Sequence, residues 1–321
     1  MKRGLVIGKF MPLHIGHCAL IRFAAGHCDE LIVSMTYKPE DVIPGPIRFE
    51  WLEEEFINEP SIKPELSLDN FDDESLPLSM RMPLWSAFLK RRFPPIDVVV
   101  SSEAYGVLLA KELGAAYISF DPERTQFPVS ATMIRSEPLK FWDFIAVPGR
   151  PYFVKKVCFF GPESTGKSTM AKHFANLYNT EFVPEVSREL ITSNDFTMDD
   201  IIRIGEAQTQ RVIDRSRTAN KLLFCDTDLI TTEIYSRHYL KQIPPILFEL
   251  EKKVKYDQYF LFDIDVPWVA DEIRDLGRRR AEMFDVFKAE LDNRKIKYQL
   301  VKGSFAQRED IIKSFVDSFI R

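Results

Sequence analysis

The sequence predicts an α/β protein of two domains, each built on a parallel sheet. Short apolar, β-branched runs alternate with longer stretches of helical period along the whole chain, a pattern typical of parallel strands covered by helices on both faces. The pattern restarts after Pro-Gly-Arg-Pro at residues 148–151, a segment expected to stop the preceding helix. A length of 321 residues also fits about two domains. We therefore expect one domain over residues 1–148 and a second over residues 149–321.

The first half alternates strand-like and helix-like runs in order. Strands are expected at residues 5–7, 31–35, 97–101 and 115–119, and helices at residues 18–25, 47–57 and 104–113. The strand segments are short and rich in valine and isoleucine, as buried strands of a parallel sheet are. Residues 60–83 are polar, acidic and interrupted by prolines, so we expect a long connection or a lid there.

The second half repeats the same alternation. Strands are expected at residues 155–160, 222–225, 258–262 and 298–301, and helices at residues 169–178, 199–217, 229–239, 278–293 and 306–320. The helical stretches show the 3.6-residue period of amphipathic helices. A further strand is expected before residues 183–189, where a helix is expected to start.

Composition and charge narrow the possible partners and location. The net charge is −5, so a general attraction to nucleic acid or to an anionic membrane is not expected. No apolar run reaches the roughly 18 residues of a transmembrane helix, and no secretory signal precedes the first strand. Cys158 and Cys225 lie in apolar strand-like runs, which indicates buried, reduced thiols. These features predict a cytoplasmic protein without nucleic acid or membrane as partner, and a homo-oligomer stays open.

A first phosphate-binding signature runs from Gly8 to His17, directly after the first strand. His14 and His17 are three residues apart at an expected helix start, so they can share one face. There the main-chain N–H groups and the helix dipole favour an anion. Gly8 lets the main chain approach a nucleotide, and Lys9 adds a positive charge. We expect these residues and Phe10 to bind ATP, although histidines at this spacing also serve as surface or capping residues.

A second segment, residues 129–135, supports the same site. Ser130 and Thr132 place hydroxyls at a helix N-terminus, and Arg135 offers a bidentate donor to phosphate. The His-x-Gly-His element and this Ser-x-Thr-x-x-Arg segment resemble the signatures of the nucleotidyltransferase superfamily. The resemblance implies that a substrate phosphate attacks the α-phosphorus of ATP and releases pyrophosphate. Because that phosphate is already an anion, catalysis needs positioning and charge stabilisation rather than a general base.

The roles in this first site follow from that chemistry. We expect His17 to contact the transition state, and His14, Lys9 and Arg135 to hold the β- and γ-phosphates. Trp51 and Trp85 are candidate stacking surfaces for an aromatic ring of the substrate. Both also suit the core face of an amphipathic helix, so two interpretations stay open for each tryptophan.

The second domain opens with a P-loop, Gly-x-x-x-x-Gly-Lys-Ser, between a strand and a helix. Main-chain N–H groups are expected to cradle the phosphates of ATP, Lys167 to bridge its β- and γ-phosphates, and Ser168 to hold Mg²⁺. Glu163 is expected to point outward. The full set expected to bind ATP is Gly161, Pro162, Glu163, Ser164, Thr165, Gly166, Lys167, Ser168 and Thr169.

Charged residues after the later strands complete this second site. Asp226 ends an apolar strand, where a carboxylate holds magnesium or acts as a base. Asp228 suits either a substrate contact or a helix N-cap. Glu185 and Arg188 suit recognition of substrate hydroxyls or a surface ion pair. The sequence leaves open whether Asp226 or Glu185 is the general base.

An arginine-rich segment follows Trp268, which is a further candidate for substrate contact. In small P-loop kinases such a segment forms a lid over the transferred phosphoryl group. A solvated basic helix face is the alternative. The lid residues are expected to be Arg274, Arg278 and Arg279.

The whole chain resembles the NadR family of bifunctional nicotinamide-mononucleotide adenylyltransferases and ribosylnicotinamide kinases. The shared blocks occur in family order: residues 8–17, 121–125, 129–135, 141–145, 161–168, 226–228 and 268–271. The resemblance implies a Rossmann-like nucleotidyltransferase domain followed by a P-loop kinase domain. It also implies ATP and Mg²⁺ as cofactors, and nicotinamide mononucleotide (NMN) and ribosylnicotinamide as substrates.

Some family members carry an N-terminal helix-turn-helix and repress transcription. Here Met1 lies just before the first strand, so we expect neither that domain nor DNA binding. Two alternatives keep both folds. One is another mononucleotide and nucleoside pair as substrates, and the other is a nucleotide-sensing regulator with one inactive domain.

Overall fold

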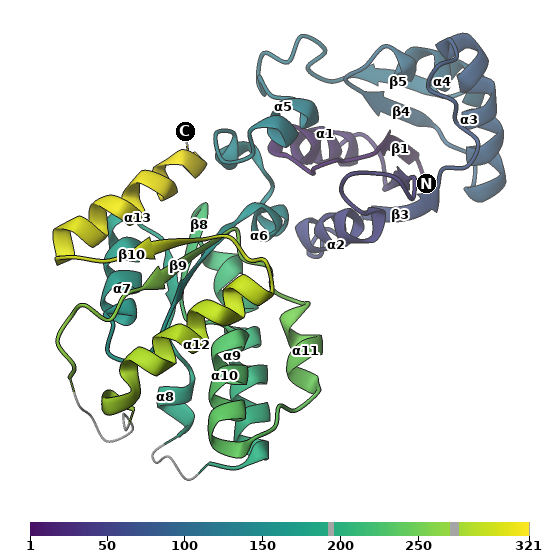
Figure 1. The fold of residues 1–321 in the computed structure, drawn as a ribbon. Coiled ribbons are helices and arrows are strands. Elements are labelled where there is room, and N and C mark those ends of the chain that lie inside the picture. The colour runs from purple at the N-terminus through teal and green to yellow at the C-terminus, as the bar shows by residue number, and fades with distance from the viewer. Residues whose placement is uncertain (192–195, 270–275, 321) are drawn as a thin grey trace. The chain divides into compact units, whose positions relative to one another are not determined.

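The computed structural model describes residues 1–191, 196–269 and 276–320 (Figure 1). The chain divides into two compact units, Met1–Arg150 and Pro151–Arg321. The boundary expected from the sequence, after residue 148, lies two residues before this division. Each unit contains a five-stranded parallel sheet, which confirms the predicted α/β class. The short helix α6 (Arg150–Phe153) spans the division.

The sheet of the first unit has the order β3-β2-β1-β4-β5, and all neighbouring strands are parallel. Its strands are β1 (Arg3–Gly8), β2 (Glu30–Tyr37), β3 (Ile62–Leu68), β4 (Val98–Ser101) and β5 (Ala116–Ser119). Its helices are α1 (Ile15–Ala25), α2 (Gly45–Glu55), α3 (Leu78–Arg92), α4 (Tyr105–Leu113), α5 (Ala131–Ser136), η1 (Trp142–Phe144) and η2 (Val147–Gly149). The most apolar strands occupy the centre, where helices bury both faces.

The prediction of a long connection over residues 60–83 is wrong, because β3 and the start of α3 lie within it. The strand Ile62–Leu68 carries Pro64 and alternating polar residues, which do not resemble a buried strand. β3 is an edge strand that pairs only with β2 within the described sheet, so a proline and solvated side chains are tolerated there. Only the part between β3 and α3 is a connection.

The second unit has the sheet order β10-β9-β6-β8-β7, again with parallel neighbours. Its strands are β6 (Lys155–Phe160), β7 (Glu181–Val183), β8 (Leu222–Asp226), β9 (Gln258–Phe262) and β10 (Tyr298–Val301). Its helices are α7 (Lys167–Leu177), α8 (Ser187–Leu190), α9 (Met198–Thr218), α10 (Leu229–Leu240), α11 (Ile246–Glu251), η3 (Gly277–Arg279), α12 (Arg280–Asn293) and α13 (Phe305–Ile320).

The alternation of side chains along β6 builds two cores in this unit. Val157 and Phe159 face α7 and α13, while Cys158 and Phe160 face α10 and α12. Cys158 is fully buried as a free thiol, and so is Cys225 in β8, which confirms the predicted burial. Helices therefore cover both faces of the sheet (Figure 1), and its carboxyl edge is left for the loops that follow the strands.

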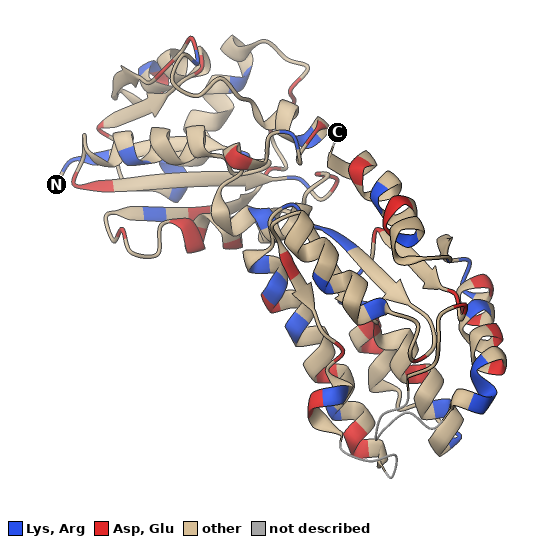
Figure 2. Cartoon of the chain, turned by 90° about the vertical axis from the view of Figure 1, so that its left-hand side faces the viewer, with Lys and Arg blue, Asp and Glu red and all other residues tan. Residues whose placement is uncertain are grey.

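The surface charges are mixed in sign. Figure 2 shows Lys and Arg interspersed with Asp and Glu along the helices of both units. Among the helices of the described residues, none has both the length and the apolar character needed to cross a bilayer.

Candidate active sites

The first unit has a cavity of about 700 Å³ at the carboxyl edge of its sheet. Residues that follow β1 and residues that follow β4 line it. These two strands are neighbours at the point where the chain order of the sheet reverses, which is where open α/β sheets bind ligands. The volume falls within the roughly 300–1,000 Å³ of small-molecule sites. The cavity is therefore large enough for a nucleotide.

His14 and His17 lie together at the start of α1 and line this cavity. The main-chain N–H of His17 donates to His14 Nδ1 at 3.3 Å, so His14 caps the helix. The two rings stack with centroids 3.6 Å apart, and Phe10 meets His17 edge-on at 5.1 Å. A side chain at position 16 would meet the His14 ring at 3.1 Å, so Gly16 makes room for the stack. The imidazoles are thus fixed before any ligand binds.

Both imidazoles are held neutral. Burial lowers the pKa of His14 to about 4, with a further contribution from Arg124. Burial also lowers the pKa of His17 well below its ordinary value, and His14 and Arg124 add to the effect. At neutral pH both rings are therefore uncharged, and each carries one N–H donor and one N acceptor.

The first unit is expected to lose stability as the pH falls from 7 to 4. The folded pKa of His14 is depressed from 6.5 to about 4, so the unfolded chain binds more protons in this window and stability rises with pH. The contribution of His14 to the free energy of unfolding is therefore complete above pH 6.5. It is lost as the pH falls towards 4, by up to about 3 kcal/mol.

Urea unfolding followed by tryptophan fluorescence measures this loss, because Trp51, Trp85 and Trp142 lie in this unit. The variant His14→Asn keeps a capping side chain but does not titrate, so its stability should change less with pH. Equal pH dependence in the two proteins would contradict the assignment.

The segment around α5 closes the other side of the cavity. Ser130 caps this helix by accepting from the Met133 N–H at 3.2 Å. The Arg135 guanidinium donates to Thr132 Oγ1 at 3.0 Å and to the carbonyl of Met11 in the β1–α1 loop. Ser130, Thr132 and Arg135 line the same cavity as His14 and His17, so the fold brings the two predicted motifs together. The assigned roles of these residues remain predictions.

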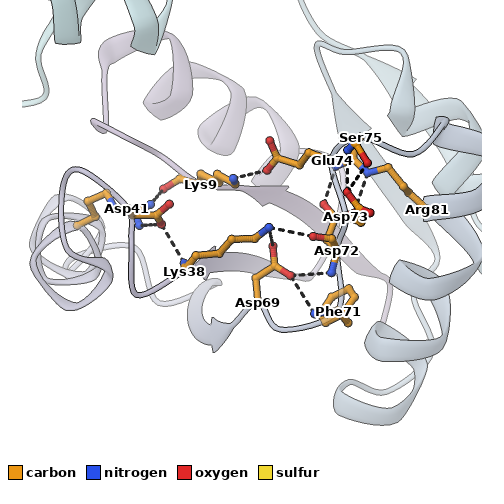
Figure 3. Close-up of polar contacts among 11 residues, drawn as sticks. Lys9, Lys38, Asp41, Asp69, Phe71, Asp72, Asp73, Glu74, Ser75 and Arg81 are labelled. Atoms are coloured by element: carbon orange, nitrogen blue, oxygen red, sulfur yellow. Dashed lines mark hydrogen bonds and ion pairs between the residues drawn. The ribbon is translucent and has the colours of Figure 1, made fainter.

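Lys9 enters the cavity beside an acidic segment (Figure 3). Its ammonium group pairs with the Glu74 carboxylate. The segment is anchored by Arg81, which donates to both carboxyl oxygens of Asp72 at 2.7 and 2.6 Å. Lys38 also donates to the main-chain carbonyl of Asp72 at 2.9 Å. Part of the stretch expected as a connection or lid is therefore a wall of the cavity.

The two tryptophans differ. Trp51 is buried and packs against Gly149, so the prediction that it offers a stacking surface is wrong. Trp51 lies on the core face of α2, which confirms the alternative interpretation as a core residue of an amphipathic helix. Trp85 lines the cavity, but its ring also packs edge-on against Phe71 at 5.1 Å in the core of the unit.

Sequence reasoning missed two arginines near this site. Arg48 is fully buried and donates to the carbonyls of Lys9 and Ile43, the latter at 2.8 Å, so it fixes the loop after β1. Arg124 lines the cavity and lowers the pKa of both histidines. The family block at residues 121–125 was a sequence signal for Arg124. Arg48 had no such signal, because nothing in the sequence distinguishes a buried arginine of an amphipathic helix from an exposed one.

In the second unit the P-loop joins β6 to α7. Gly161 and Gly166 adopt φ values of 136° and 89°, a region that favours glycine. The Lys167 ammonium donates to the carbonyls of Gly161 and Pro162, both at 2.8 Å. A cavity of about 420 Å³ adjoins the loop. It is lined by Gly161 and by the successive residues Glu163, Ser164, Thr165, Gly166, Lys167, Ser168 and Thr169.

Glu185 and Arg188 line this cavity, whereas Asp226 is buried beside the P-loop residues Lys167 and Ser168 and is not part of the described wall. Asp226 is 1% exposed at the end of β8, next to β6. Burial raises its pKa to about 6; Lys167 opposes the rise and Glu185 adds to it. Glu185 and Arg188 line the cavity, and Arg188 Nε donates to the Glu185 carboxylate at 3.2 Å. The ion pair expected as an alternative is formed, but at the cavity wall.

A smaller cavity of about 80 Å³ shares several wall residues with the P-loop cavity: Glu163, Glu185, Arg188, Thr231 and Tyr235. The two hollows therefore adjoin. Because Glu163 lines both of them, the expectation that it points outward is wrong.

Asp228 is a structural residue. Its carboxylate accepts from the Thr231 N–H at 3.1 Å and from the Tyr259 hydroxyl at 2.8 Å, so it caps α10. The substrate-contact prediction for Asp228 is therefore wrong, and the N-cap alternative is confirmed.

Trp268, Arg278 and Arg279 are the described members of the predicted substrate-contact and lid segment. Trp268 packs against Gly277 and under Arg280, whose guanidinium lies 5.8 Å from the ring centroid. The expected substrate contact of Trp268 stays a prediction. Arg279 pairs with Glu282, and Arg278 is exposed. Arg274 lies outside the described residues.

Two other arginines donate hydrogen bonds to main-chain carbonyls of the P-loop. Arg280 donates to the carbonyl of Ser164 at 2.9 Å, and Arg308 donates to the carbonyl of Thr165 at 2.7 Å. Arg280 belongs to the predicted arginine-rich run, one position beyond the expected lid residues. Arg308, in α13, gave no signal in the sequence because its partner is more than 140 residues away in the chain.

Comparison with known proteins identifies the family. A family model described as "AAA domain" matches residues 156–308. The trifunctional NAD biosynthesis/regulator protein NadR of Salmonella typhimurium is 32% identical over 301 residues, which cover 85% of this chain and 72% of that protein. Its Escherichia coli counterpart is 30% identical with the same coverage.

A crystal structure of a NadR protein in complex with NAD and AMP-PNP superposes with a TM-score of 0.83. The alignment covers 99% of this chain and 96% of that one at 22% sequence identity, which shows a shared fold. Together with the extended sequence identity, these matches show that the chain belongs to the NadR family.

Proposed function

We propose that this chain is a bifunctional enzyme of NAD biosynthesis. The second domain, residues 149–321, phosphorylates the 5′-hydroxyl of ribosylnicotinamide with ATP to give NMN and ADP. The first domain, residues 1–148, transfers the adenylyl group of a second ATP to NMN and releases pyrophosphate. The observation that carries the proposal is that each phosphate-binding motif lines a cavity of its own in a chain 32% identical to a protein named for NAD biosynthesis.

In the kinase step a hydroxyl oxygen attacks the γ-phosphorus of ATP, and the bond to the β-phosphate oxygen breaks. The proton of the hydroxyl must leave, so a carboxylate near the acceptor helps as a general base. Glu185 lines both the P-loop cavity and the small cavity beside it, which is where phosphate donor and acceptor must meet. Glu185 is therefore our choice for the base, and Lys167 stabilises the charge on the transferred group.

Asp226 and Ser168 fit the role of magnesium ligands. Oδ1 of Asp226 has no hydrogen-bond partner within the described residues, although the carboxyl is buried. Oxygen ligands and a retained water shell suit Mg²⁺, and Ser168, the last residue of the P-loop motif, lies in the first turn of α7. When bound, the ion would neutralise charge on the β- and γ-phosphates.

The variants Glu185→Gln and Asp226→Asn are expected to separate base from metal ligand. Glu185→Gln should lower kcat roughly a hundred-fold while sparing the Mg²⁺ dependence, because only proton transfer is impaired. Asp226→Asn should raise the Mg²⁺ concentration needed for half-maximal rate. Steady-state kinase rates over a Mg²⁺ titration measure both effects. A shift of the Mg²⁺ dependence in Glu185→Gln alone would reverse the assignment.

In the adenylyl-transfer step the NMN phosphate oxygen attacks the α-phosphorus, and the bond to the pyrophosphate oxygen breaks. No proton needs to be removed from the nucleophile, so the site supplies position and charge stabilisation. His17 and the main-chain N–H groups at the start of α1 face the reacting phosphate. Lys9, His14 and Arg135 hold the leaving pyrophosphate, with Lys9 released from Glu74 when the triphosphate binds.

Mass-spectrometric product analysis after incubation with ATP, Mg²⁺ and ribosylnicotinamide tests the proposal. NMN, ADP, NAD and pyrophosphate are expected. Parallel incubations with pantetheine phosphate or flavin mononucleotide test the alternative substrates. A product from only one of the two steps would support a regulator with one inactive domain, and no product at all would refute the enzyme assignment.

The location and partners form part of the same proposal. Both steps consume ATP, and the four cysteines of the chain are free thiols, which suits a reducing, cytoplasmic compartment. We infer small molecules as the partners, with neither nucleic acid nor membrane required for the two reactions. A homo-oligomer is compatible with this chemistry and is testable by light scattering.

A further inference from the structure

The small cavity of the second unit is built from α9, α10 and the segment after β7. Its volume of about 80 Å³ is well below the roughly 300–1,000 Å³ of a drug-sized site, so it suits a single ring rather than a whole nucleotide. Six of the fourteen described residues that line it are apolar or aromatic: Ile191, Phe196, Ile201, Ile204, Tyr235 and Tyr239. The polar atoms of the other residues decide which ring binds.

Gln208 presents an unused hydrogen-bond donor at this cavity. Its side chain is 2% exposed, and Oε1 accepts from the Val186 N–H at 3.0 Å. That bond fixes the orientation of the amide, so Nε2 is the free end. Among residues 1–191, 196–269 and 276–320, Nε2 has no hydrogen-bond partner. A buried donor without an acceptor is costly, and native proteins keep few of them.

Thr227 presents a second unused polar atom at the same cavity. It is 3% exposed, and its Oγ1 has no hydrogen-bond partner in the described part of the chain. Its main chain is held at φ 79° by the bond from its N–H to the Phe159 carbonyl at 3.0 Å. This conformation is strained for a β-branched residue, and such strain concentrates at functional sites. Gln208 also borders a neighbouring hollow beside Asp228, and the small cavity is the one that both Gln208 and Thr227 line.

Charge at the cavity also selects the ligand. The wall carries the carboxylates of Glu163 and Glu185 and the guanidinium of Arg188, which pairs with Glu185. The two carboxylates outnumber the one guanidinium, which favours a cationic ring and disfavours an anionic substituent. A pyridinium ring with a neutral substituent meets both conditions.

We propose that Gln208 and Thr227 recognise the carboxamide of the substrate base, with Gln208 Nε2 donating to the carboxamide oxygen and the carboxamide N–H donating to Thr227 Oγ1. This inference rests on the proposed kinase function and assigns it two specificity-determining residues. A primary carboxamide is the neutral group that accepts from one side and donates from the other. Filling both free atoms with one ligand group removes two unsatisfied positions at once.

The experiment compares three nucleosides on each variant by kcat/KM for phosphorylation. Ribosylnicotinamide keeps both contacts, 3-acetylpyridine riboside keeps the carbonyl but has no N–H, and unsubstituted pyridinium riboside has neither. For the unmodified protein we expect a loss of roughly ten-fold at each step of the series. Because all three nucleosides are measured on one variant, a general folding defect cancels in the ratios.

Thr227→Val should remove the preference for the amide over the ketone and leave the preference for the ketone over the unsubstituted ring. Gln208→Met should instead remove the preference for the ketone over the unsubstituted ring. Thr227→Ser keeps the hydroxyl, so it should keep the preference for the amide over the ketone. Thr209→Val is the matched control: Thr209 is equally buried on α9, but its hydroxyl donates to the Gly205 carbonyl at 2.8 Å, so both ratios should stay unchanged.

Ratios that neither variant changes, or that the control changes equally, would overturn the carboxamide assignment while leaving the kinase intact. Failure of the unmodified protein to phosphorylate any of the three nucleosides would instead refute the proposed kinase function. The two failures are therefore distinguishable.

Discussion

Replacing Lys167 by alanine is expected to lower ribosylnicotinamide phosphorylation by roughly a thousand-fold and to leave adenylyl transfer to NMN unchanged. The Lys167 ammonium is buried and already directed at the P-loop carbonyls of Gly161 and Pro162, so it needs little rearrangement to meet a phosphate. Its charge stabilises the phosphoryl group in transit, and a neutral methyl group cannot replace it. Separate assays that start from ribosylnicotinamide and from NMN measure the two activities.

Lys172→Ala is the matched control, because Lys172 lies on the same helix, α7, with an exposed side chain. Both activities of this control should equal those of the unmodified protein. Loss of both activities in Lys167→Ala, in a protein that still unfolds cooperatively, would contradict the independence of the two sites.

Replacing His17 by alanine is the reciprocal case, with adenylyl transfer expected to fall roughly several hundred-fold while phosphorylation is kept. His17 lines the first cavity and is held between His14 and Phe10. A preorganised neutral imidazole donates a hydrogen bond to charge that develops on the α-phosphoryl oxygens, and alanine leaves that charge to water. The assay follows NAD formation from NMN and ATP, so the kinase step does not limit it.

His27→Ala serves as the comparison, since His27 follows the C-terminal end of the same helix and bonds to the Phe23 carbonyl at 2.8 Å. Its NAD formation should be normal. His17→Asn should recover part of the rate, because an amide N–H can still donate at that position. Unchanged NAD formation in His17→Ala would remove His17 from the catalytic machinery.

The elements that sequence reasoning predicted well are those with a local cause. Three such elements are the P-loop, the His-x-Gly-His turn and the Ser130 cap. Each depends on a few residues that are close together in the sequence, so its pattern can be recognised without knowledge of the fold. The strands with continuous apolar runs were equally clear, because burial on both faces leaves no polar positions. Strand β3 was not predicted, because an edge strand tolerates Pro64 and solvated side chains and so lacks a continuous apolar run.

Residues whose role depends on a distant partner were the ones misplaced. Trp51 was a candidate for stacking until its contact with Gly149, nearly 100 residues away, placed it in the core. Asp228 was ambiguous until Tyr259 and Thr231 took both of its carboxyl oxygens. The lid expected at Arg274, Arg278 and Arg279 stays a prediction, whereas the contact of Arg280 with the Ser164 carbonyl depends on a partner more than 100 residues away.

The sequence by itself determined the fold class, the presence of two phosphate-binding motifs and their family, because each depends on short-range pattern and spacing. The tertiary structure alone decided which side chains complete each cavity. It brought Arg135 to the Met11 loop and Arg308 to Thr165, and it left Gln208 and Thr227 facing one hollow with a free polar atom each. The physical reason is that hydrogen bonds and burial act through space, and only the packing of strands and helices sets which distant residues come within a few ångströms of each other.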